Sequence, residues 1–412
     1  MKTKNNNKKI KVIQIAHASH SFFLSNEEKD LKKLILSDWY FRTSQQLKKY
    51  YPEIKVECWC PERLYKNEVS FVESGIKLRI FPTTFSPRYG LDFSIKMLKE
   101  IKKEIKKAEE EKTNLVIHLH EYHNLHGLLI STIFKKQKII GQHHGGSWPI
   151  RHLKQTKSYR PFLPFFILGQ IWENRVLKNI NSFYALSQDE INYLKRKKLN
   201  SKIIFQTMGI EDIYFNKLDK NKARKKLNLS PKKKILLYVG RINKEKGVKY
   251  LLDAMKKLQD SKNSEIELKI IGFGPQEKEF QGYSKKLNLR NTEFLGSIFG
   301  EKKLVYLSAA DALILPSSKE GAPVIIMEAM ARNLPIVSTN VGGTPLMIKN
   351  NKNGIIIKQK SSQDLAKGIK EVLAWKNKNI REHAKVYKWK KIIEDTVADY
   401  EDYQTKNEKK RR

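Results

Sequence analysis

Two glutamates, Glu320 and Glu328, stand eight positions apart in the segment PSSKEGAPVIIMEAM, residues 316–330. Proline suits the first turn of a helix, so the pattern predicts a helix from Pro323, with Glu328 one turn inside it and Glu320 in the loop before it. A helix N-terminus offers backbone N–H groups and partial positive charge to a diphosphate. Carboxylates accept hydrogen bonds from sugar hydroxyls, and Gly321 lets a ligand approach the backbone. The segment therefore predicts a site for a phosphorylated, polyhydroxylated ligand.

A second segment, YVGRINKEKG (residues 238–247), carries two cations just after a strand-like run. Arg241 can bind phosphate oxygens through the fork of its guanidinium, and Lys246 adds a mobile point charge. Gly240 permits a tight turn before them. Taken alone, Arg241 and Lys246 could simply be two solvated surface cations. They indicate a phosphate site only in combination with the two glutamates.

Strand-like apolar runs alternate with amphipathic helical stretches along the chain. Strands separated by helices predict parallel sheets that are covered on both faces. Two series of such runs predict two doubly wound domains, in agreement with a length of 412 residues, which exceeds what one core usually supports. Ligands of such folds bind at the carboxyl ends of the strands, and a cleft between two facing domains is the expected site. The first series lies at residues 11–17, 55–60, 77–82, 114–120, 138–144, 182–187 and 202–208, and the second at 234–240, 267–274, 292–296, 312–317, 335–339 and 354–358.

The composition limits the class of protein. Lys and Arg exceed Asp and Glu by 38, a charge that attracts nucleic acid, anionic lipid or anionic substrates, although lysines spread over solvated helix faces would give the same sum. No run approaches the ~18 to 20 apolar residues of a membrane-spanning helix. The basic first residues lead into an apolar segment that fits a first strand better than a secretory signal, so we expect a cytoplasmic protein. Cys58 and Cys60 alternate on a predicted strand, where a disulfide would be strained, and are expected to be reduced packing residues.

Several segments, in this order and spacing, resemble the donor domain of family 4 glycosyltransferases: GRINKEKG, IIGFGP, FLGSI, ADALILPSSKEGAPVIIMEAMARNLPIVSTNVGGTPLMI and NGIIIK. The resemblance covers most of residues 232–400. It implies the α/β GT-B fold, in which two doubly wound, Rossmann-like domains face a cleft. We therefore expect an N-terminal acceptor-binding domain at residues 1–215, a hinge at 216–233, a C-terminal donor-binding domain at 234–385, and at 386–412 a C-terminal helix, packed back on the N-terminal domain, with a basic tail.

The resemblance implies a role for each charged residue of the donor site. Arg241 and Lys246 would bind the donor diphosphate. Glu320 would bind the donor sugar as part of the catalytic centre, and Glu328 would bind the ribose hydroxyls.

Smaller residues complete this expected site. Gly321 and Ala322 would offer backbone N–H groups, and Ser297 and Ile298 would lie near the base. The glycine pair at residues 342–343 either belongs to the site or merely turns the chain.

The reaction that the family implies is retaining transfer of a hexose from a nucleoside diphosphate sugar to an acceptor hydroxyl. The cations and the helix end would stabilise the charge on the leaving diphosphate, and a leaving phosphate oxygen would take the acceptor proton. We expect no protein nucleophile, no cofactor and no obligatory metal. Glycoside hydrolysis by paired carboxylates is the alternative, but it does not need anion-binding groups in the same place. The donor base and sugar stay open, since the residues that set them vary within the family.

The first half of the chain resembles the family's acceptor domain less closely. NLVIHLHEYHN resembles a strand that ends in a histidine facing the reaction centre, which implies a catalytic role for His120 beside Glu121. The loop at residues 16–30 lacks the glycines that relatives use there, which puts ligand contacts from this loop in doubt. The hinge Asn-Gly of the family appears as Met208-Gly209.

Four histidines in and after this strand raise a zinc site as an alternative: His118, His120, His123 and His126. Two of them, His118 and His120, share a strand face, but the others lie in the following loop or helix, without a Cys or Asp cluster nearby. We therefore expect no metal site.

The segment SYRPFLPFFILGQIWENRVLK (residues 158–178) is aromatic and apolar with basic flanks, and it fits either a contact with an anionic membrane or a buried helix. We expect a glycan or lipid-linked acceptor, a role in cell-surface glycan or glycolipid synthesis, and a peripheral location on the inner face of the cell membrane. A basic nucleic-acid-binding protein and an inactive GT-B partner subunit are the other candidate functions. Dispersed lysines without a recognised module argue against nucleic acid as a partner.

Overall fold

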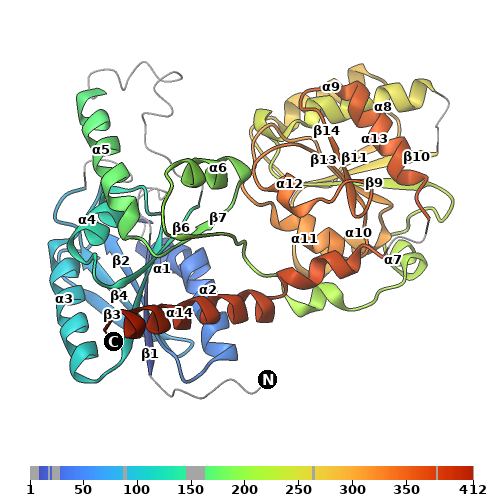
Figure 1. The fold of residues 1–412 in the computed structure, drawn as a ribbon. Coiled ribbons are helices and arrows are strands. Elements are labelled where there is room, and N and C mark those ends of the chain that lie inside the picture. Colours follow the sequence, from blue (N-terminus) through green and yellow to red (C-terminus); the bar gives the residue numbers. More distant parts are fainter. Residues whose placement is uncertain are drawn as a thin grey trace. The chain divides into compact units, whose positions relative to one another are not determined.

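The chain forms two compact units (Figure 1). The computed structural model describes residues 9–16, 19–20, 28–86, 91–144, 163–261, 265–376 and 379–411. For residues 28–30, 163–166 and 403–411 it describes the backbone but not the side chains. The N-terminal unit comprises Met1–Leu186, Glu190–Gln206 and Ile392–Arg412, and the C-terminal unit comprises Ser187–Asp189 and Thr207–Lys391. The last helix of the chain therefore belongs mostly to the unit that the first half of the chain builds.

The described strands of the N-terminal unit form an eight-stranded sheet in the order β3-β4-β2-β1-β5-β6-β7-β8. Adjacent strands are parallel except β3 and β4. The strands are β1 (Ile10–Ile15), β2 (Lys55–Glu62), β3 (Val69–Glu73), β4 (Ile76–Pro82), β5 (Asn114–His120), β6 (Lys138–Gln142), β7 (Ser182–Ala185) and β8 (Lys202–Phe205). The chain builds the sheet outward in opposite directions from β1 and β5, so the switch point of this doubly wound sheet lies between these two strands.

Strand β3 was missed by the sequence analysis. It pairs with β4 through a tight turn at Ser74 and Gly75, whose φ angles of 52° and 72° are those that a two-residue hairpin needs. Its side chains are exposed or half-buried, so no apolar run marks it. Strand ends also differ by a few residues from the prediction. In the C-terminal unit, strand β10 (Ile266–Ile271) ends three residues before the predicted end at residue 274, and Gly272 follows it with a φ of 141°.

The described helices of the N-terminal unit are α1 (Glu28–Ser37), α2 (Trp39–Tyr50), α3 (Ile95–Glu110), α4 (Leu125–Ile133), α5 (Leu163–Val176), η4 (Leu177–Asn179), α6 (Gln188–Arg196) and α14 (Trp389–Arg411). Two residues of α14 bind the sheet. The carboxylate of Asp399 accepts hydrogen bonds from the hydroxyls of Ser182 and Tyr184, each at 3.0 Å, and the hydroxyl of Tyr400 lies 2.9 Å from Nδ1 of His118. Helix α14 is thus part of the core of this unit.

The described strands of the C-terminal unit form a parallel six-stranded sheet in the order β11-β10-β9-β12-β13-β14. They are β9 (Lys234–Val239), β10 (Ile266–Ile271), β11 (Thr292–Phe294), β12 (Ala312–Leu315), β13 (Ile336–Thr339) and β14 (Gly354–Ile357). The helices are η5 (Asp212–Phe215), α7 (Lys220–Lys226), η6 (Lys244–Lys246), α8 (Val248–Asp260), α9 (Glu277–Lys286), α10 (Gly300–Ala309), α11 (Val324–Ala331), α12 (Thr344–Met347), α13 (Ser362–Leu373) and η7 (Arg381–Tyr387).

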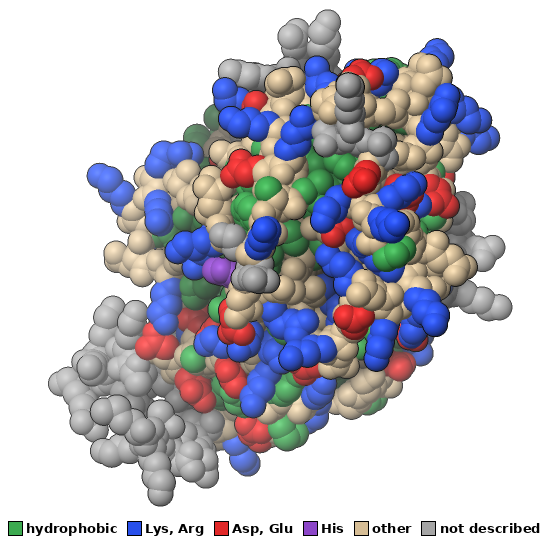
Figure 2. Space-filling model, turned by 90° about the vertical axis from the view of Figure 1, so that its right-hand side faces the viewer, with side chains coloured by type: hydrophobic (Ala, Val, Ile, Leu, Met, Phe, Trp, Pro, Cys, Tyr) green, Lys and Arg blue, Asp and Glu red, His purple; other side chains and the backbone are tan. Residues whose placement is uncertain are grey.

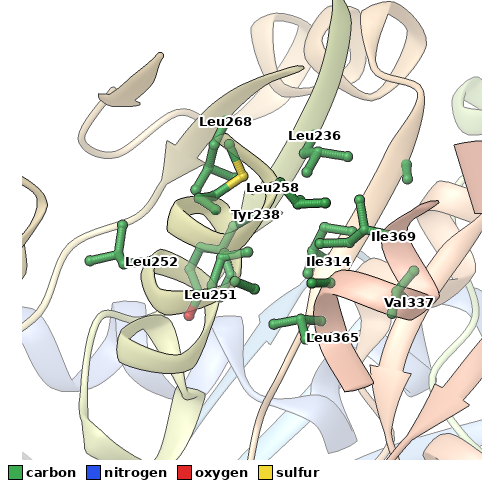
Figure 3. Close-up of a cluster of buried hydrophobic side chains, with 14 of the residues drawn as sticks. Leu236, Tyr238, Leu251, Leu252, Leu258, Leu268, Ile314, Val337, Leu365 and Ile369 are labelled. Atoms are coloured by element: carbon green, nitrogen blue, oxygen red, sulfur yellow. The ribbon is translucent and has the colours of Figure 1, made fainter. Parts of the chain in front are cut away.

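A hydrophobic core between this sheet and two helices fixes the strands (Figure 3). Leu236 and Tyr238 are two positions apart on β9 and point to the same face, as strand geometry requires. They belong to one buried cluster with Leu251 of α8 and Ile369 of α13. Because each fully buried aliphatic side chain contributes roughly 1.5 to 3 kcal/mol, this packing holds the strand ends, and the loops that follow them, in place.

The structure bears on the state of the cysteines, on membrane-spanning helices and on the distribution of charge. Cys58 and Cys60 are free and buried, as predicted, and burial raises the pKa of the Cys58 thiol to about 12. In the described part of the chain, no helix combines the length and apolar character needed to cross a membrane. On the face shown in Figure 2, Lys and Arg are spread widely, with Asp and Glu among them.

Candidate functional site

The switch point of the C-terminal unit lies between β9 and β12, because β10 and β11 extend the sheet on one side of this pair and β13 and β14 on the other. All strands are parallel, so the loops that follow them emerge at one edge of the sheet. The loop after β9 carries Arg241 and Lys246, and the loop after β12 carries Glu320. The topology therefore brings together the cations and one of the two glutamates singled out by the sequence.

Two glycines allow these loops to approach one another. Gly247 has a φ of 69°, and a Cβ there would lie 2.1 Å from the carbonyl oxygen of Pro316. Gly342 has a φ of 56°, and a Cβ there would lie 2.0 Å from the carbonyl oxygen of Glu320. The N–H of Gly343 donates to the carbonyl of Gly321 at 2.6 Å. The glycine pair at 342–343 therefore packs on the glutamate loop as well as turning the chain.

Glu320 and Lys246 form an ion pair across the two loops. The ammonium of Lys246 lies 2.7 Å from Oε1 of Glu320, and the hydroxyl of Ser317 donates to the same oxygen at 2.7 Å. The side chain of Glu320 is largely buried, whereas that of Arg241 is exposed. The hydroxyl of Tyr238 donates to the backbone carbonyl of Arg241 at 2.8 Å and fixes the turn. The edge of the sheet therefore carries an anchored carboxylate, its partner Lys246 and, in the same loop as Lys246, the exposed Arg241.

Glu328 lies in the second turn of α11, a helix that begins at Val324 with Pro323 as its N-cap. Its carboxylate is buried and lies 2.8 Å from the ammonium of Lys303 on α10. Burial alone would lower the pKa of Lys303, but the Glu328 carboxylate outweighs it and the pKa is raised. Lys303 was missed by the sequence analysis, because nothing in its spacing separates it from the many other lysines of the chain.

The remaining predicted donor residues lie at the same edge. Gly240 follows β9. Its carbonyl oxygen would lie only 1.8 Å from a Cβ atom at Gly272, so this approach requires a glycine at position 272. Gly321 is exposed and Ala322 half-buried in the loop before α11. Ser297 is exposed and Ile298 buried in the loop after β11, which is two strands from β9. These last two residues are thus farther along the sheet edge from the ion pair than the other predicted residues.

In the N-terminal unit, His120 ends β5 at the switch point beside β1. Its Nε2 lies 2.6 Å from Oε1 of Gln14 on β1, and its Nδ1 lies 2.9 Å from Nε2 of His144 after β6. The amide nitrogen of Gln14 donates to the hydroxyl of Tyr400 at 3.3 Å. Because Oε1 of Gln14 can only accept, Nε2 of His120 carries the proton and Nδ1 accepts from His144. The ring is therefore held at both nitrogens.

Glu121 follows His120 with a φ of 80°, an unusual backbone conformation for a residue other than glycine. Oε1 of this buried carboxylate lies 3.3 Å from Nδ1 of His143. Burial alone would raise the pKa of Glu121, but His143 and its neighbours lower it below its ordinary value.

The four histidines considered together in the sequence do not converge. His118 stacks on His120, with ring centroids 4.8 Å apart, and binds the hydroxyl of Tyr400. His123 instead contacts His143, with ring centroids 5.3 Å apart, while His126 is buried in α4. The four histidines that the sequence raised as an alternative zinc site therefore do not meet at one point.

The buried His126 makes folding sensitive to acid. Neither of its ring nitrogens has a hydrogen-bond partner among the described residues, and burial lowers its pKa to about 3. Because the unfolded histidine protonates near pH 6.5, the stability is complete above that pH and falls between pH 6.5 and 3, by up to about 1.4 kcal/mol per pH unit. We expect His126→Phe to reduce this loss, as measured by urea unfolding at about pH 7 and about pH 5. The pKa of the buried His118 is also lowered to about 3. His118 therefore contributes the same pH dependence of stability to the unchanged chain and to the variant. An unchanged pH dependence in the variant would refute this role of His126.

Known proteins resemble the C-terminal half of the chain most clearly. Residues 219–389 match the family model described as Glycosyl transferases group 1. The chain is 30% identical over 197 residues to an uncharacterized glycosyltransferase of Methanocaldococcus jannaschii, covering 46% of this chain and 50% of that protein. It is 33% identical over 154 residues to a Bacillus subtilis glycosyltransferase named for teichuronic acid biosynthesis, covering 37% and 36% of the two chains. The chain thus spans half or less of the length of these two relatives.

Solved structures extend the likeness to both units. Sucrose-phosphate synthase from Thermosynechococcus elongatus superposes with a TM-score of 0.65 at 18% identity, covering 96% of this chain and all of the other. WaaG, a glycosyltransferase involved in lipopolysaccharide biosynthesis, gives a TM-score of 0.61 at 15% identity, covering 94% and 99%. The chain therefore has the two-domain GT-B fold of these glycosyltransferases, as its motifs predicted.

Proposed function

We propose that this chain, whose residues 219–389 form a group 1 glycosyltransferase domain, transfers a hexose with retention from a nucleoside diphosphate sugar to an acceptor hydroxyl. The observation that carries the proposal is the anchored Lys246–Glu320 pair at the switch point of the C-terminal unit, with Arg241 in the same loop as Lys246. Two structural neighbours support the donor class, since an Anabaena protein was solved with UDP and an E. coli protein with UDP-2-fluoro glucose.

Each side chain has a chemical task in this proposal. Arg241 and Lys246 bind the diphosphate and stabilise the charge that develops as it leaves, together with the N-terminal end of α11. Glu320 accepts hydrogen bonds from the sugar, and its bond from Ser317 holds the carboxylate in position. Glu328 accepts from the ribose hydroxyls, and its ion pair with Lys303, at 2.8 Å, holds this buried carboxylate in place. A leaving phosphate oxygen takes the acceptor proton, so no protein nucleophile is required.

The experiment that tests the function is a donor screen with the purified full chain. Uridine and guanosine diphosphate sugars are ranked by thermal-shift stabilisation, because a ligand that binds only the folded state raises the melting temperature. Hydrolysis and transfer to glycan or lipid-linked acceptors are then measured, and the anomeric configuration of the product is determined by NMR. Absence of stabilisation and turnover with every donor would favour an inactive partner subunit, and an inverted product would refute retention.

Activity is expected to survive chelation of free divalent ions. The cations Arg241 and Lys246, rather than a bound metal, neutralise the diphosphate in this proposal. Initial turnover measured directly after addition of EDTA should equal that of the untreated enzyme. An immediate loss of turnover that Mg²⁺ or Mn²⁺ restores would show that a metal bridges the diphosphate.

We further propose that the acceptor is a glycan or a lipid-linked molecule and that α5 contacts an anionic membrane surface. Ile167, Leu168 and Ile171 are exposed on α5, whereas Glu173 and Val176 are buried. An exposed apolar patch on a helix with Arg175 in its last turn, followed by Lys178 in η4, suits an anionic head-group interface. The basic residues that precede this segment in the sequence lie outside the described residues: Arg151, Lys154, Lys157 and Arg160. The side chains of Phe165 and Phe166 lie outside them as well.

Leu168→Glu is expected to weaken binding to vesicles of anionic phospholipid several-fold in co-sedimentation, because it places a negative charge in the centre of the patch. Binding of the unchanged protein should fall as salt is added. Val72→Glu is the matched control, since Val72 is equally exposed, at 67% against 66% for Leu168, on β3 of the same unit. Equal binding of both variants, or no binding of the unchanged protein at low salt, would exclude α5 as a membrane contact.

A further inference from the structure

Three buried side chains of the N-terminal unit offer metal-ligand atoms in one place. One ligand atom each from Glu121, His123 and His143 lies within 4.8 Å of the others. Glu121 and His123 follow β5, and His143 follows β6 directly. Because β5 and β6 are adjacent and parallel, with His120 paired to Gln142, the two loops emerge together at the carboxyl edge of the sheet. The convergence is thus a product of the sheet topology.

The place is buried and rich in carboxylates. Glu121, His123 and His143 are 6%, 4% and 9% exposed. Oε1 of Glu190 lies 3.6 Å from Nδ1 of His143, and the fully buried Glu173 lies beside His123. Three carboxylates therefore share this interior site with two histidines, which carry a charge only when protonated. A divalent cation would supply positive charge at any pH at which the histidines are neutral.

The hydrogen bond of His123 prepares one nitrogen for a ligand. Its Nδ1 lies 3.0 Å from Oε1 of Glu173, so Nδ1 carries the proton that the carboxylate accepts. The lone pair is then on Nε2, which is buried and has no hydrogen-bond partner among the described residues. A carboxylate that holds one histidine nitrogen while the other binds metal is the usual arrangement around zinc-binding histidines.

We propose that Glu121, His123 and His143 bind a Zn²⁺ ion through one carboxylate oxygen and two imidazole nitrogens. This set of ligands suits Zn²⁺ among the divalent metals. The ion would tie the loop after β5 to the loop after β6. Glu121 adjoins His120 and His143 adjoins His144, the two residues whose rings are hydrogen-bonded at 2.9 Å. The metal would therefore orient this histidine pair. It would be a structural ion of the N-terminal unit, whereas Arg241 and Lys246 belong to the C-terminal unit.

The test is metal binding by the full chain after removal of any affinity tag. The protein is stripped with a strong chelator, reconstituted with Zn²⁺ or Co²⁺, and freed of excess metal. We expect about one Zn²⁺ per chain by elemental analysis and the visible absorption of Co²⁺ in a low-coordinate site. His143→Asn and Glu121→Gln should lose this stoichiometric binding. Glu173→Gln keeps all three ligands and should weaken binding by about 10- to 100-fold.

His126→Phe is the matched control, because His126 is equally buried but lies outside the group, and it should retain the metal. Failure of the unchanged chain to bind stoichiometric Zn²⁺ or Co²⁺ overturns the proposal, whether or not the variants fold. Equal binding by His143→Asn, Glu121→Gln and the unchanged chain overturns it too. Long chelation should lower the melting temperature, and Zn²⁺ but not Mg²⁺ should restore it, which separates this site from any metal on the donor diphosphate.

Discussion

Glu320→Ala is expected to lower kcat/KM for sugar transfer by at least about 100-fold, equivalent to about 2.7 kcal/mol of lost transition-state stabilisation. The Glu320 carboxylate is largely buried and is held by Lys246 and Ser317 at 2.7 Å each, so its oxygens are fixed before a sugar arrives. A hydrogen-bond acceptor that is oriented in advance stabilises the transition state most when it lies at the reacting centre. Removal of the carboxylate also releases Lys246 from its partner, which would change the geometry of the diphosphate site.

Steady-state kinetics with the donor found in the screen measures this effect, and circular dichroism and thermal unfolding establish that the variant folds. Glu245→Ala is the control, because Glu245 is an exposed acidic residue whose carboxylate lies near Lys319 in a neighbouring loop. Its turnover should stay close to that of the unchanged enzyme. Turnover of folded Glu320→Ala within a few-fold of normal would contradict the assignment of the donor site.

Arg241→Ala is expected to reduce kcat/KM by a comparable factor, at least about 100-fold, and also to weaken binding of the free nucleoside diphosphate. The Tyr238 hydroxyl holds the backbone carbonyl of Arg241, while the side chain of Arg241 is exposed. We therefore expect the guanidinium to reach a ligand without movement of the loop. Arg241→Lys should recover only part of the loss, since an ammonium lacks the fork that matches two phosphate oxygens.

Calorimetric titration with the nucleoside diphosphate separates binding from turnover in these variants. Lys244→Ala removes an exposed cation three positions away and serves as the control for a general loss of positive charge. If Lys244→Ala and Arg241→Ala weaken binding equally, the effect is one of net charge. If neither variant changes binding or turnover, Arg241 does not hold the diphosphate.

The amino-acid sequence alone indicated the architecture and most residues of the candidate donor site. Apolar runs such as those at residues 234–240 and 312–317 identify buried parallel strands, because a strand covered on both faces has to be apolar at successive positions. The order of strands and helices then places the following loops at one edge. Glu320, Arg241 and Lys246 could be selected in this way, since proline, glycine and charged residues mark loops by their local conformational preferences.

Only the tertiary structure decided which charges meet. The Lys303–Glu328 pair joins two helices, and the hydrogen bond between His118 and Tyr400 joins residues 282 positions apart. Lys303 is one of 81 Lys and Arg residues, and its surroundings depend on how α10 packs beside α11. The sequence likewise suggested four neighbouring histidines as a group, whereas strand pairing assembles Glu121, His123 and His143. Local patterns fix the conformation of a segment, but pairings across the fold follow from strand order and side-chain packing, which no short stretch of sequence contains.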